Sequence, residues 1–198
     1  MKKATLELIE KIKIDLKEML SEKRYNHSIG VMNKAVELAK IYGVDEDKVA
    51  LAGLTHDIAK EISDEEAFKI AEKNNIVIDN FIKANPKLIH GKIGAILAKQ
   101  KYGLDEQIQK AIEFHTEGTP DMDLFGKIIY VADKIEETRT KPEEIKHWRI
   151  IAKRDIDEAV IQIINFNIIK LIEGNRLIDK ASINTRNAIM LKKESKYW

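Results

Sequence analysis

The chain has 198 residues, enough for one domain with a substantial core. Its 34 Lys and Arg nearly balance its 33 Asp and Glu, so no net charge supports nonspecific binding to nucleic acid or to an anionic membrane. Because the sequence has no cysteine, disulfides, iron–sulfur clusters and thiolate zinc sites are excluded, and any metal site must use imidazole and carboxylate ligands.

Apolar residues recur at helical spacing, while nine Gly and three Pro leave few residues for the turns of a β-rich fold. We therefore expect an all-α protein. Charged residues interrupt the apolar N-terminal stretch, and no later stretch is long enough to span a membrane, so a cytoplasmic protein without membrane contact is expected. Basic residues are interleaved with acidic ones, and no Gly-rich phosphate loop is visible, which argues against a nucleic-acid partner.

Four helices are expected in the first part of the chain, at residues 4–22, 25–42, from the Asp45 cap to about 59, and about 63–74. Gly43 ends the second of them. Ser63-Asp-Glu-Glu66 is typical of a capping box and opens the fourth.

Asn85-Pro86 marks the next boundary, and helices are then expected at residues 87–102, 105–115, about 122–138, 145–172 and after Gly174-Asn175. Asp105 provides a cap and Gly118-Thr-Pro120 a break. We expect a single domain over residues 1–198, with a core at about 20–140 and a helical extension at about 142–198.

Several polar residues lie on the apolar faces of these helices, namely His27, His56, His90, His115 and Asp133. A single such histidine is more often a hydrogen-bonded core residue than a metal ligand. However, burying Asp57 and Asp133 among imidazoles without a cation would be costly, so the residues together predict a metal site. His147 lies in a charged segment without a matching carboxylate and is expected at the surface.

The residues alone leave the number of ions open. His27, His56, Asp57 and Asp133 suffice for one divalent ion with positions left for water or substrate. If His90 and His115 bind a second ion and Asp57 bridges the two, six ligands serve two metals and leave room for a bridging hydroxide and phosphate oxygens.

Five motifs in this order resemble the HD-domain metal-dependent phosphohydrolases, and in particular the YqeK-type symmetrical diadenosine tetraphosphate hydrolases. They are Arg24-Tyr-Asn-His27, Leu51-Ala-Gly-Leu-Thr-His-Asp-Ile-Ala-Lys60, Ala84-Asn-Pro-Lys-Leu-Ile-His90-Gly91, Ala111-Ile-Glu-Phe-His115-Thr116 and Tyr130-Val-Ala-Asp133-Lys-Ile-Glu136. The resemblance spans about residues 20–190. It implies an all-α HD-domain helical bundle that hydrolyses diadenosine tetraphosphate to two ADP.

The resemblance also implies two iron ions with a hydroxide between them as nucleophile. One ion would be held by His27, His56, Asp57 and Asp133, and the other by Asp57, His90 and His115. Asp57 and Lys60 are the expected catalytic residues. Imidazole and carboxylate suit manganese, cobalt and zinc as well as iron, so the metal is not fixed by the residues.

Several residues are expected to contact the nucleotide substrate or the ADP product: Arg24, Lys60, Thr116, Asp133, Arg139 and Arg186. Two departures from the family pattern bear on this set. Glu137-Thr138 replaces the usual Pro-Gly turn before Arg139, and Thr185-Arg186-Asn187 matches the closing Arg-Asn motif only loosely. Arg186 is equally compatible with pairing to a surface carboxylate.

Other readings of the same residues are an HD phosphohydrolase of another nucleotide, such as a nucleoside mono- or triphosphate, a cyclic dinucleotide or a guanosine alarmone. A noncatalytic nucleotide-sensing module is less favoured, because all six ligands are present. A homodimer is also considered, through the opening helix or the Ile-rich run at residues 161–169, either of which serves equally well as core.

Overall fold

The computed structural model describes residues 2–194, and this part of the chain contains α-helices and one 3-10 helix but no strand. The helices are α1 (Lys3–Met19), α2 (Glu22–Tyr42), α3 (Glu46–Thr55), α4 (Asp64–Lys73), α5 (Asn80–Ala84), the 3-10 helix η1 (Pro86–Ile89), α6 (His90–Tyr102), α7 (Glu106–Phe114), α8 (Leu124–Ile135), α9 (Ile145–Ala152), α10 (Ile156–Glu173) and α11 (Lys180–Glu194). The all-α prediction is confirmed.

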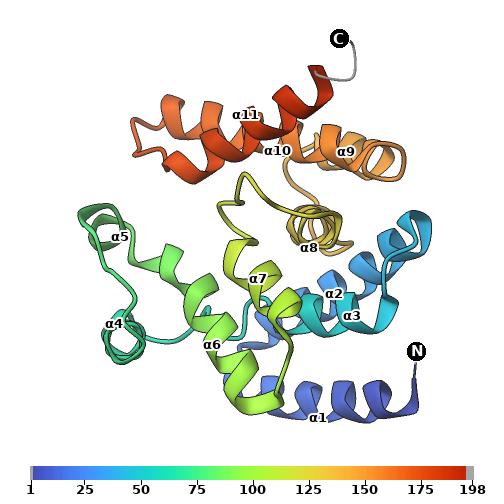
Figure 1. The fold of residues 1–198 in the computed structure, drawn as a ribbon, viewed down its shortest axis with the longest axis vertical. Helices are drawn as coiled ribbons and strands as arrows, with labels where there is room; N and C mark the ends of the chain where they lie inside the picture. The colour runs from blue at the N-terminus through green and yellow to red at the C-terminus, as the bar shows by residue number, and fades with distance from the viewer. Residues whose placement is uncertain (1, 195–198) are drawn as a thin grey trace.

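Helix α8 lies in the middle of the molecule, between a group formed by α2, α3 and α7 and a layer formed by α9, α10 and α11 (Figure 1). It packs against α2, α3, α7, α9 and α10. Because neighbours surround it, its sequence is apolar on nearly all sides, and Ile128, Ile129 and Tyr130 are almost completely buried. Asp133 is therefore a carboxylate placed inside the core.

Several predicted helix starts are confirmed by their caps. The Asp45 side chain accepts hydrogen bonds from the N–H groups of Asp47 and Lys48, and Ser63 accepts one from Glu66. Asp105 likewise caps α7 by accepting from the N–H of Ile108. These contacts satisfy backbone donors that have no partner within the helix, which explains why the starts were legible in the sequence.

Two helices were predicted too long next to the expected metal ligands. The helix expected to reach Ala59 ends at Thr55, and residues 56–61 form turns. The helix expected at residues 87–102 begins as η1 and becomes α-helical only at His90, after the short helix α5 that the pattern did not predict. His56, Asp57 and His90 thus lie at helix ends and not within helices.

The expectation of one helix at residues 145–172 was wrong, and the helix expected to reach Thr138 ends at Ile135. Residues 153–155 separate α9 from α10, and the Asp155 side chain caps α10 by accepting from the N–H of Glu158 at 3.0 Å. Apolar periodicity continues across this break because both helices bury a face against the same core.

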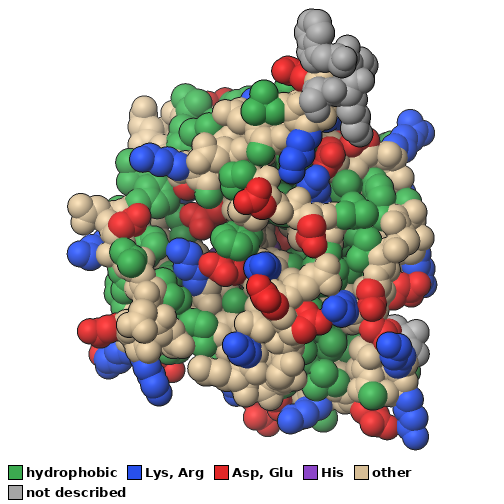
Figure 2. All heavy atoms as spheres, viewed as in Figure 1, with side chains coloured by type: hydrophobic (Ala, Val, Ile, Leu, Met, Phe, Trp, Pro, Cys, Tyr) green, Lys and Arg blue, Asp and Glu red, His purple; other side chains and the backbone are tan. Residues whose placement is uncertain are grey.

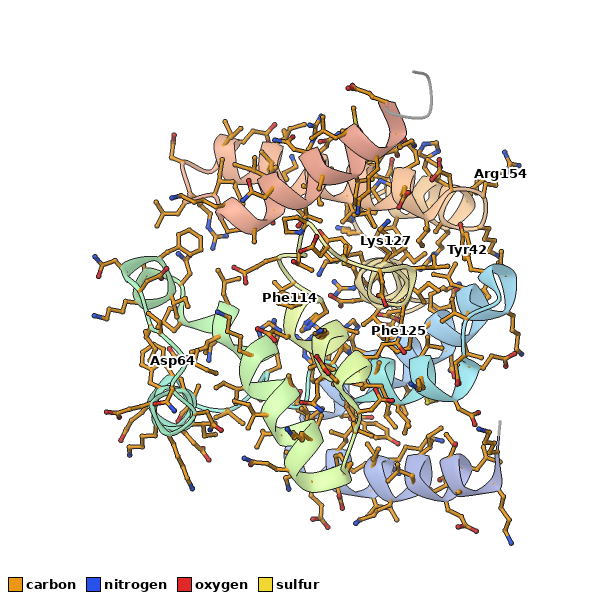
Figure 3. The ribbon with its side chains drawn as sticks, in the orientation of Figure 1. Tyr42, Asp64, Phe114, Phe125, Lys127 and Arg154 are labelled. Atoms are coloured by element: carbon orange, nitrogen blue, oxygen red, sulfur yellow. The ribbon has the colours of Figure 1, made fainter. Side chains whose placement is uncertain are left out.

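The C-terminal helices are fixed to the rest of the fold by polar contacts as well as by packing. Tyr42 at the end of α2 donates its hydroxyl to the Ala152 carbonyl at 2.7 Å, and Lys127 of α8 pairs with Asp157 of α10 at 2.6 Å (Figure 3). The division of the chain near residue 140 stays a prediction. None of the described helices combines the length and the apolar character that crossing a bilayer requires.

Candidate metal centre

Six side chains from five segments of the chain meet inside the helical bundle. His27 lies on α2, Asp133 lies on α8, and the remaining four lie at helix ends. All six are at least 94% buried, with exposures of 6% for His27, 0% for His56, 2% for Asp57, 3% for His90, 2% for His115 and 4% for Asp133. His147, by contrast, is exposed, as the sequence predicted.

Four of these residues form a first group around one oxygen of Asp57. The distance from His27 Nε2 to Asp133 Oδ1 is 3.0 Å, and that from His27 Nε2 to Asp57 Oδ2 is 3.8 Å. His56 Nε2 lies 3.4 Å from the same Asp57 oxygen and 3.7 Å from Asp133 Oδ1. The ligand atoms of His27, His56 and Asp57 lie within 4.8 Å of one another, and the distances to Asp133 suit a fourth ligand of the same cation.

The other oxygen of Asp57 faces a second group. Asp57 Oδ1 is 3.2 Å from His90 Nε2 and 3.5 Å from His115 Nε2, and the two imidazole nitrogens are 3.0 Å apart. The carboxylate therefore has one oxygen toward each group. This is the geometry of a carboxylate that bridges two ions.

Hydrogen bonds fix which nitrogen of each imidazole faces the centre. Nδ1 of His56, His90 and His115 contacts the carbonyl oxygen of the residue three positions earlier, at 2.8, 2.5 and 2.6 Å. A carbonyl only accepts, so each Nδ1 carries the proton and each neutral ring presents a lone pair at Nε2. Such tautomers are the ones that bind metal through Nε2.

The ligand atoms at the centre fit a cation, and they do not all satisfy one another. Nε2 of His90 and Nε2 of His115 face each other without a proton between them when both rings are neutral. Nε2 of His56 and Oδ1 of Asp57 are buried and have no hydrogen-bond partner. Buried polar atoms of this kind need a partner, and a divalent ion in each group would provide one.

Burial and neighbouring charges shift the pKa values of the buried histidines and aspartates in different directions. Burial lowers the pKa of His56, but Asp57 and Asp133 outweigh that effect and raise it to about 9. Burial also lowers the pKa of His115, to about 4. Burial raises the pKa values of both aspartates, yet His56 and the other neighbouring donors and cations hold them well below the usual range. Both carboxylates are thus ionised at neutral pH, as metal ligands must be.

Basic side chains surround the centre where it opens to solvent. Nη1 of Arg24 is 2.5 Å from Asp57 Oδ2, and Nη2 of Arg139 is 2.9 Å from Asp133 Oδ1. Nζ of Lys60 lies 3.1 Å from His90 Nε2, and burial lowers the pKa of this lysine. Arg139 therefore reaches the centre although Glu137-Thr138 replaces the Pro-Gly turn that is usual before it.

Two more of the expected substrate residues occupy different surroundings. Thr116 Oγ1 is 3.1 Å from His115 Nε2 and 3.4 Å from His90 Nε2, so it belongs to the second group. Arg186 instead donates to the side-chain oxygens of Asn165 and Asn187, on α10 and α11. The structure brings Thr116 to the centre and ties Arg186 to the C-terminal helices.

Two residues at the centre were not singled out from the sequence. Lys134 Nζ lies 2.5 Å from Asp133 Oδ2, and Glu136 Oε1 lies 3.0 Å from His27 Nδ1. Both stand in the string Asp133-Lys-Ile-Glu136. A signal was available, since a glutamate three residues after an inward aspartate shares its helix face.

A cavity of about 410 Å³ adjoins the first group and offers room for an elongated anion. Its lining includes His27 and Glu136 together with basic side chains: Lys23, Arg24, Arg139 and Lys141. On the face seen in Figure 2, Lys and Arg are interspersed with Asp and Glu, in keeping with the net charge of +1. The local excess of basic groups beside buried carboxylates is suited to phosphate groups.

The sequence of this chain is similar to those of known proteins. A sequence model of the HD domain matches residues 24–138. The symmetrical bis(5'-nucleosyl)-tetraphosphatase of Bacillus subtilis (strain 168) is 38% identical over 87% of this chain and 92% of its own length. The protein of the same description from Halalkalibacterium halodurans is 35% identical, over 90% of this chain and 95% of its own length.

A solved structure has the same fold. It is described as a predicted HD superfamily hydrolase involved in NAD metabolism from Clostridium acetobutylicum. The superposition gives a TM-score of 0.89 at 38% sequence identity, and it covers 92% of this chain and 97% of the other.

Proposed function

We propose that this chain, which belongs to the HD-domain family, is a cytoplasmic metal-dependent hydrolase that cleaves diadenosine tetraphosphate symmetrically to two ADP. The similarity to symmetrical bis(5'-nucleosyl)-tetraphosphatases runs over about nine tenths of each chain, and it supports the reaction and the substrate class. The observation that carries the chemistry is Asp57, whose two oxygens face two different groups of imidazoles.

Two divalent ions at this centre would activate a water molecule and neutralise charge that develops on the phosphoryl group. We propose that His27, His56, Asp57 and Asp133 hold one ion and that Asp57, His90 and His115 hold the other. Asp57 is the residue whose loss affects both. Its ionised state at neutral pH, favoured by the neighbouring His56, suits this role.

The reaction adds the oxygen of one water to an inner phosphorus and breaks the anhydride bond between the two central phosphoryl groups. The attacked phosphorus keeps the water oxygen, the bridging oxygen leaves with the other half, and each half is then ADP. The two protons of the water pass to the products or to solvent. For the attack to fall at this bond, one ADP unit must be held beside the metals. The cavity lined by Arg24 and Arg139 has the charge and size for its phosphates.

The basic residues at the rim are proposed to stabilise the negative charge of the phosphates. Arg24 and Arg139 have planar guanidinium groups that can bind phosphate oxygens in pairs, and Lys60 offers a point charge beside His90. When the substrate binds, its phosphates would replace Asp57 and Asp133 as partners of these cations. Thr116 could add a hydroxyl donor next to His115.

Iron is the proposed metal, on the family resemblance. We further propose a homodimer through exposed apolar side chains of the opening helix α1, among them Leu6 and Ile14 at 44% and 63% exposure, or of the Ile-rich run in α10, such as Ile169 at 52%. Most of that run, including Ile161, Ile163 and Ile164, is core. Light scattering would show a mass of twice 22.7 kDa for the dimer.

The test of the reaction uses purified protein reconstituted anaerobically with ferrous ion and supplied with diadenosine tetraphosphate. ADP is expected as the sole nucleotide product, whereas AMP plus ATP would refute the symmetrical cleavage. The His115→Ala variant should lose turnover, and His147→Ala, which removes an exposed histidine away from the centre, is the matched control. Parallel reconstitution with manganese, cobalt and zinc identifies the metal that supports the highest rate.

A further inference from the structure

Glu136, the residue that follows α8, is a completely buried carboxylate that contacts a proposed metal ligand. Its side chain is 0% exposed, and Oε1 lies 3.0 Å from Nδ1 of His27. Thr138 completes its hydrogen bonds, donating its backbone N–H to Oε2 and its hydroxyl to Oε1, each at 2.6 Å. The carboxylate is thus held in one orientation, with one oxygen directed at the imidazole of His27.

His27 differs in this respect from the other three histidines of the centre. Nδ1 of His56, His90 and His115 donates to a backbone carbonyl within its own helical turn, whereas Nδ1 of His27 faces a side chain that is distant in sequence. A carboxylate that accepts this N–H fixes the ring more strongly than a carbonyl and makes Nε2 a better donor to a metal.

Gly30 provides the space that the Glu136 side chain occupies. It lies on α2, one helical turn after His27. A Cβ at this position would lie 2.4 Å from Glu136 Oε2 and 3.0 Å from Cδ. Any side chain at residue 30 would therefore displace the carboxylate, so α2 carries both the imidazole and the gap that admits its partner.

We propose that Glu136 is a positioning residue that orients His27 and strengthens its bond to the metal in the first group, while the ion held by Asp57, His90 and His115 does not depend on it. The inference rests on the proposed two-metal centre. Removal of such a carboxylate partner costs about 10–100-fold in metal affinity. The two metal positions of this chain are therefore unequal, and Glu136 acts on one of them.

Cobalt(II) titration of the metal-free protein, without substrate, tests the proposal. The wild type is expected to bind two ions per chain. In Glu136→Ala, one ion should keep its affinity and the other should bind about 10–100-fold more weakly. Glu136→Gln should lose less, because an amide oxygen still accepts the N–H without carrying a charge. Thermal melting verifies that each variant is folded.

Glu137→Gln is the matched control, because it changes the adjacent carboxylate, which pairs with Lys34 and Arg149. It should bind both ions like the wild type. Gly30→Ala disturbs the contact between Glu136 and His27 from the side of α2 and should weaken binding of the same ion. In the Glu136→Ala background, Gly30→Ala should add little, since the atoms with which its Cβ collides most closely are gone.

Cobalt affinities in Glu136→Ala within twofold of the wild type at both positions would overturn the proposal, as would additive effects of Gly30→Ala and Glu136→Ala. His27→Ala separates this failure from failure of the metal centre. If His27→Ala loses one ion and Glu136→Ala loses none, the centre stands and the role of Glu136 is wrong. If His27→Ala also keeps both ions, the assignment of His27 and the proposal fall together.

Discussion

Substitution of Gly91 by alanine should damage the metal centre more than it damages the fold. Gly91 follows His90 at the start of α6, where a Cβ would lie 2.6 Å from the carbonyl oxygen of Glu113 and 3.1 Å from that of Ile112. Both oxygens belong to α7, and the Ile112 oxygen accepts the Nδ1–H of His115. The clash therefore acts between the two helices that bring His90 and His115 together.

The size of the shift follows from the contact. Ordinary van der Waals contact begins at 3.4 Å, so α6 and α7 must separate by about 0.8 Å at this point. Metal–ligand distances tolerate only about 0.2 Å, so the second group, with its Nε2 atoms 3.0 Å apart, should bind its ion poorly. A displacement of about 1 Å costs on the order of 10²-fold in rate.

The effect on stability should be small by comparison. Overpacking costs about 1–3 kcal/mol, and replacing an interior helical glycine by alanine returns about 1 kcal/mol. The net loss of up to about 2 kcal/mol corresponds to a fall in Tm of about 4–8 °C for a chain of this size. Turnover and metal content should therefore be low in this variant although it is still folded at 25 °C.

The assay compares Gly91→Ala with Gly94→Ala, one turn further along α6. At Gly94 the nearest atom is Ile112 Cγ2 at 3.2 Å, so the neighbouring groups need to move by only a few tenths of an ångström, and this variant should retain both ions and most of the activity. Metal analysis, hydrolysis of diadenosine tetraphosphate and thermal melting are measured on both. Full metal content and wild-type turnover in Gly91→Ala would refute the reasoning.

Three further changes test separate parts of the site. Asp57→Ala should lose both ions in metal analysis, whereas His115→Ala should lose one; an equal loss would contradict the bridge. Asp57 and Asp133 raise the pKa of His56 to about 9, so the ion of the first group must displace its proton, and the affinity for that ion should rise about tenfold per unit from pH 6 to 8 and level off above 9; a flat profile in calorimetry would contradict this. Arg149 donates to the carbonyl oxygens of residues 135, 136 and 139, at 2.7, 2.7 and 3.0 Å. The Arg149→Met variant should therefore loosen the loop that carries Arg139 and raise KM by more than it lowers kcat; an unchanged KM would exclude that role.

Local chemistry explains which elements could be read from the sequence. Asp45, Ser63 and Asp105 cap helices through contacts within three residues, so their effect does not depend on the rest of the fold. The break between α9 and α10 was missed, because Asp155, which caps α10 in the same way, lies inside an apolar pattern that continues through both helices. A cap inside such a pattern is easily hidden by the periodicity on both sides.

The inward faces of five of the six expected ligands were also legible, because a histidine or aspartate among apolar residues at helical spacing must enter the core. That the α-helix ends at Thr55 was not legible, since residues 56–61 contain no Gly or Pro and continue in turns, with bonds from the N–H of Ile58 to the Thr55 carbonyl and from the N–H of Lys60 to the Asp57 carbonyl. Arg139 is a similar case: the sequence departs from the usual turn before it, and only the structure shows its guanidinium 2.9 Å from Asp133.

Periodicity, helix caps and the lack of cysteine act locally or by composition, so the sequence is enough to predict a helical protein whose metal ligands are imidazoles and carboxylates. How those residues divide into two groups depends on the tertiary structure. It directed one oxygen of Asp57 to His56 and the other to His90, placed Glu136 behind His27, and tied Arg186 to Asn165. These are contacts between segments far apart in the chain, and their distances depend on how closely α2, α6, α7 and α8 pack.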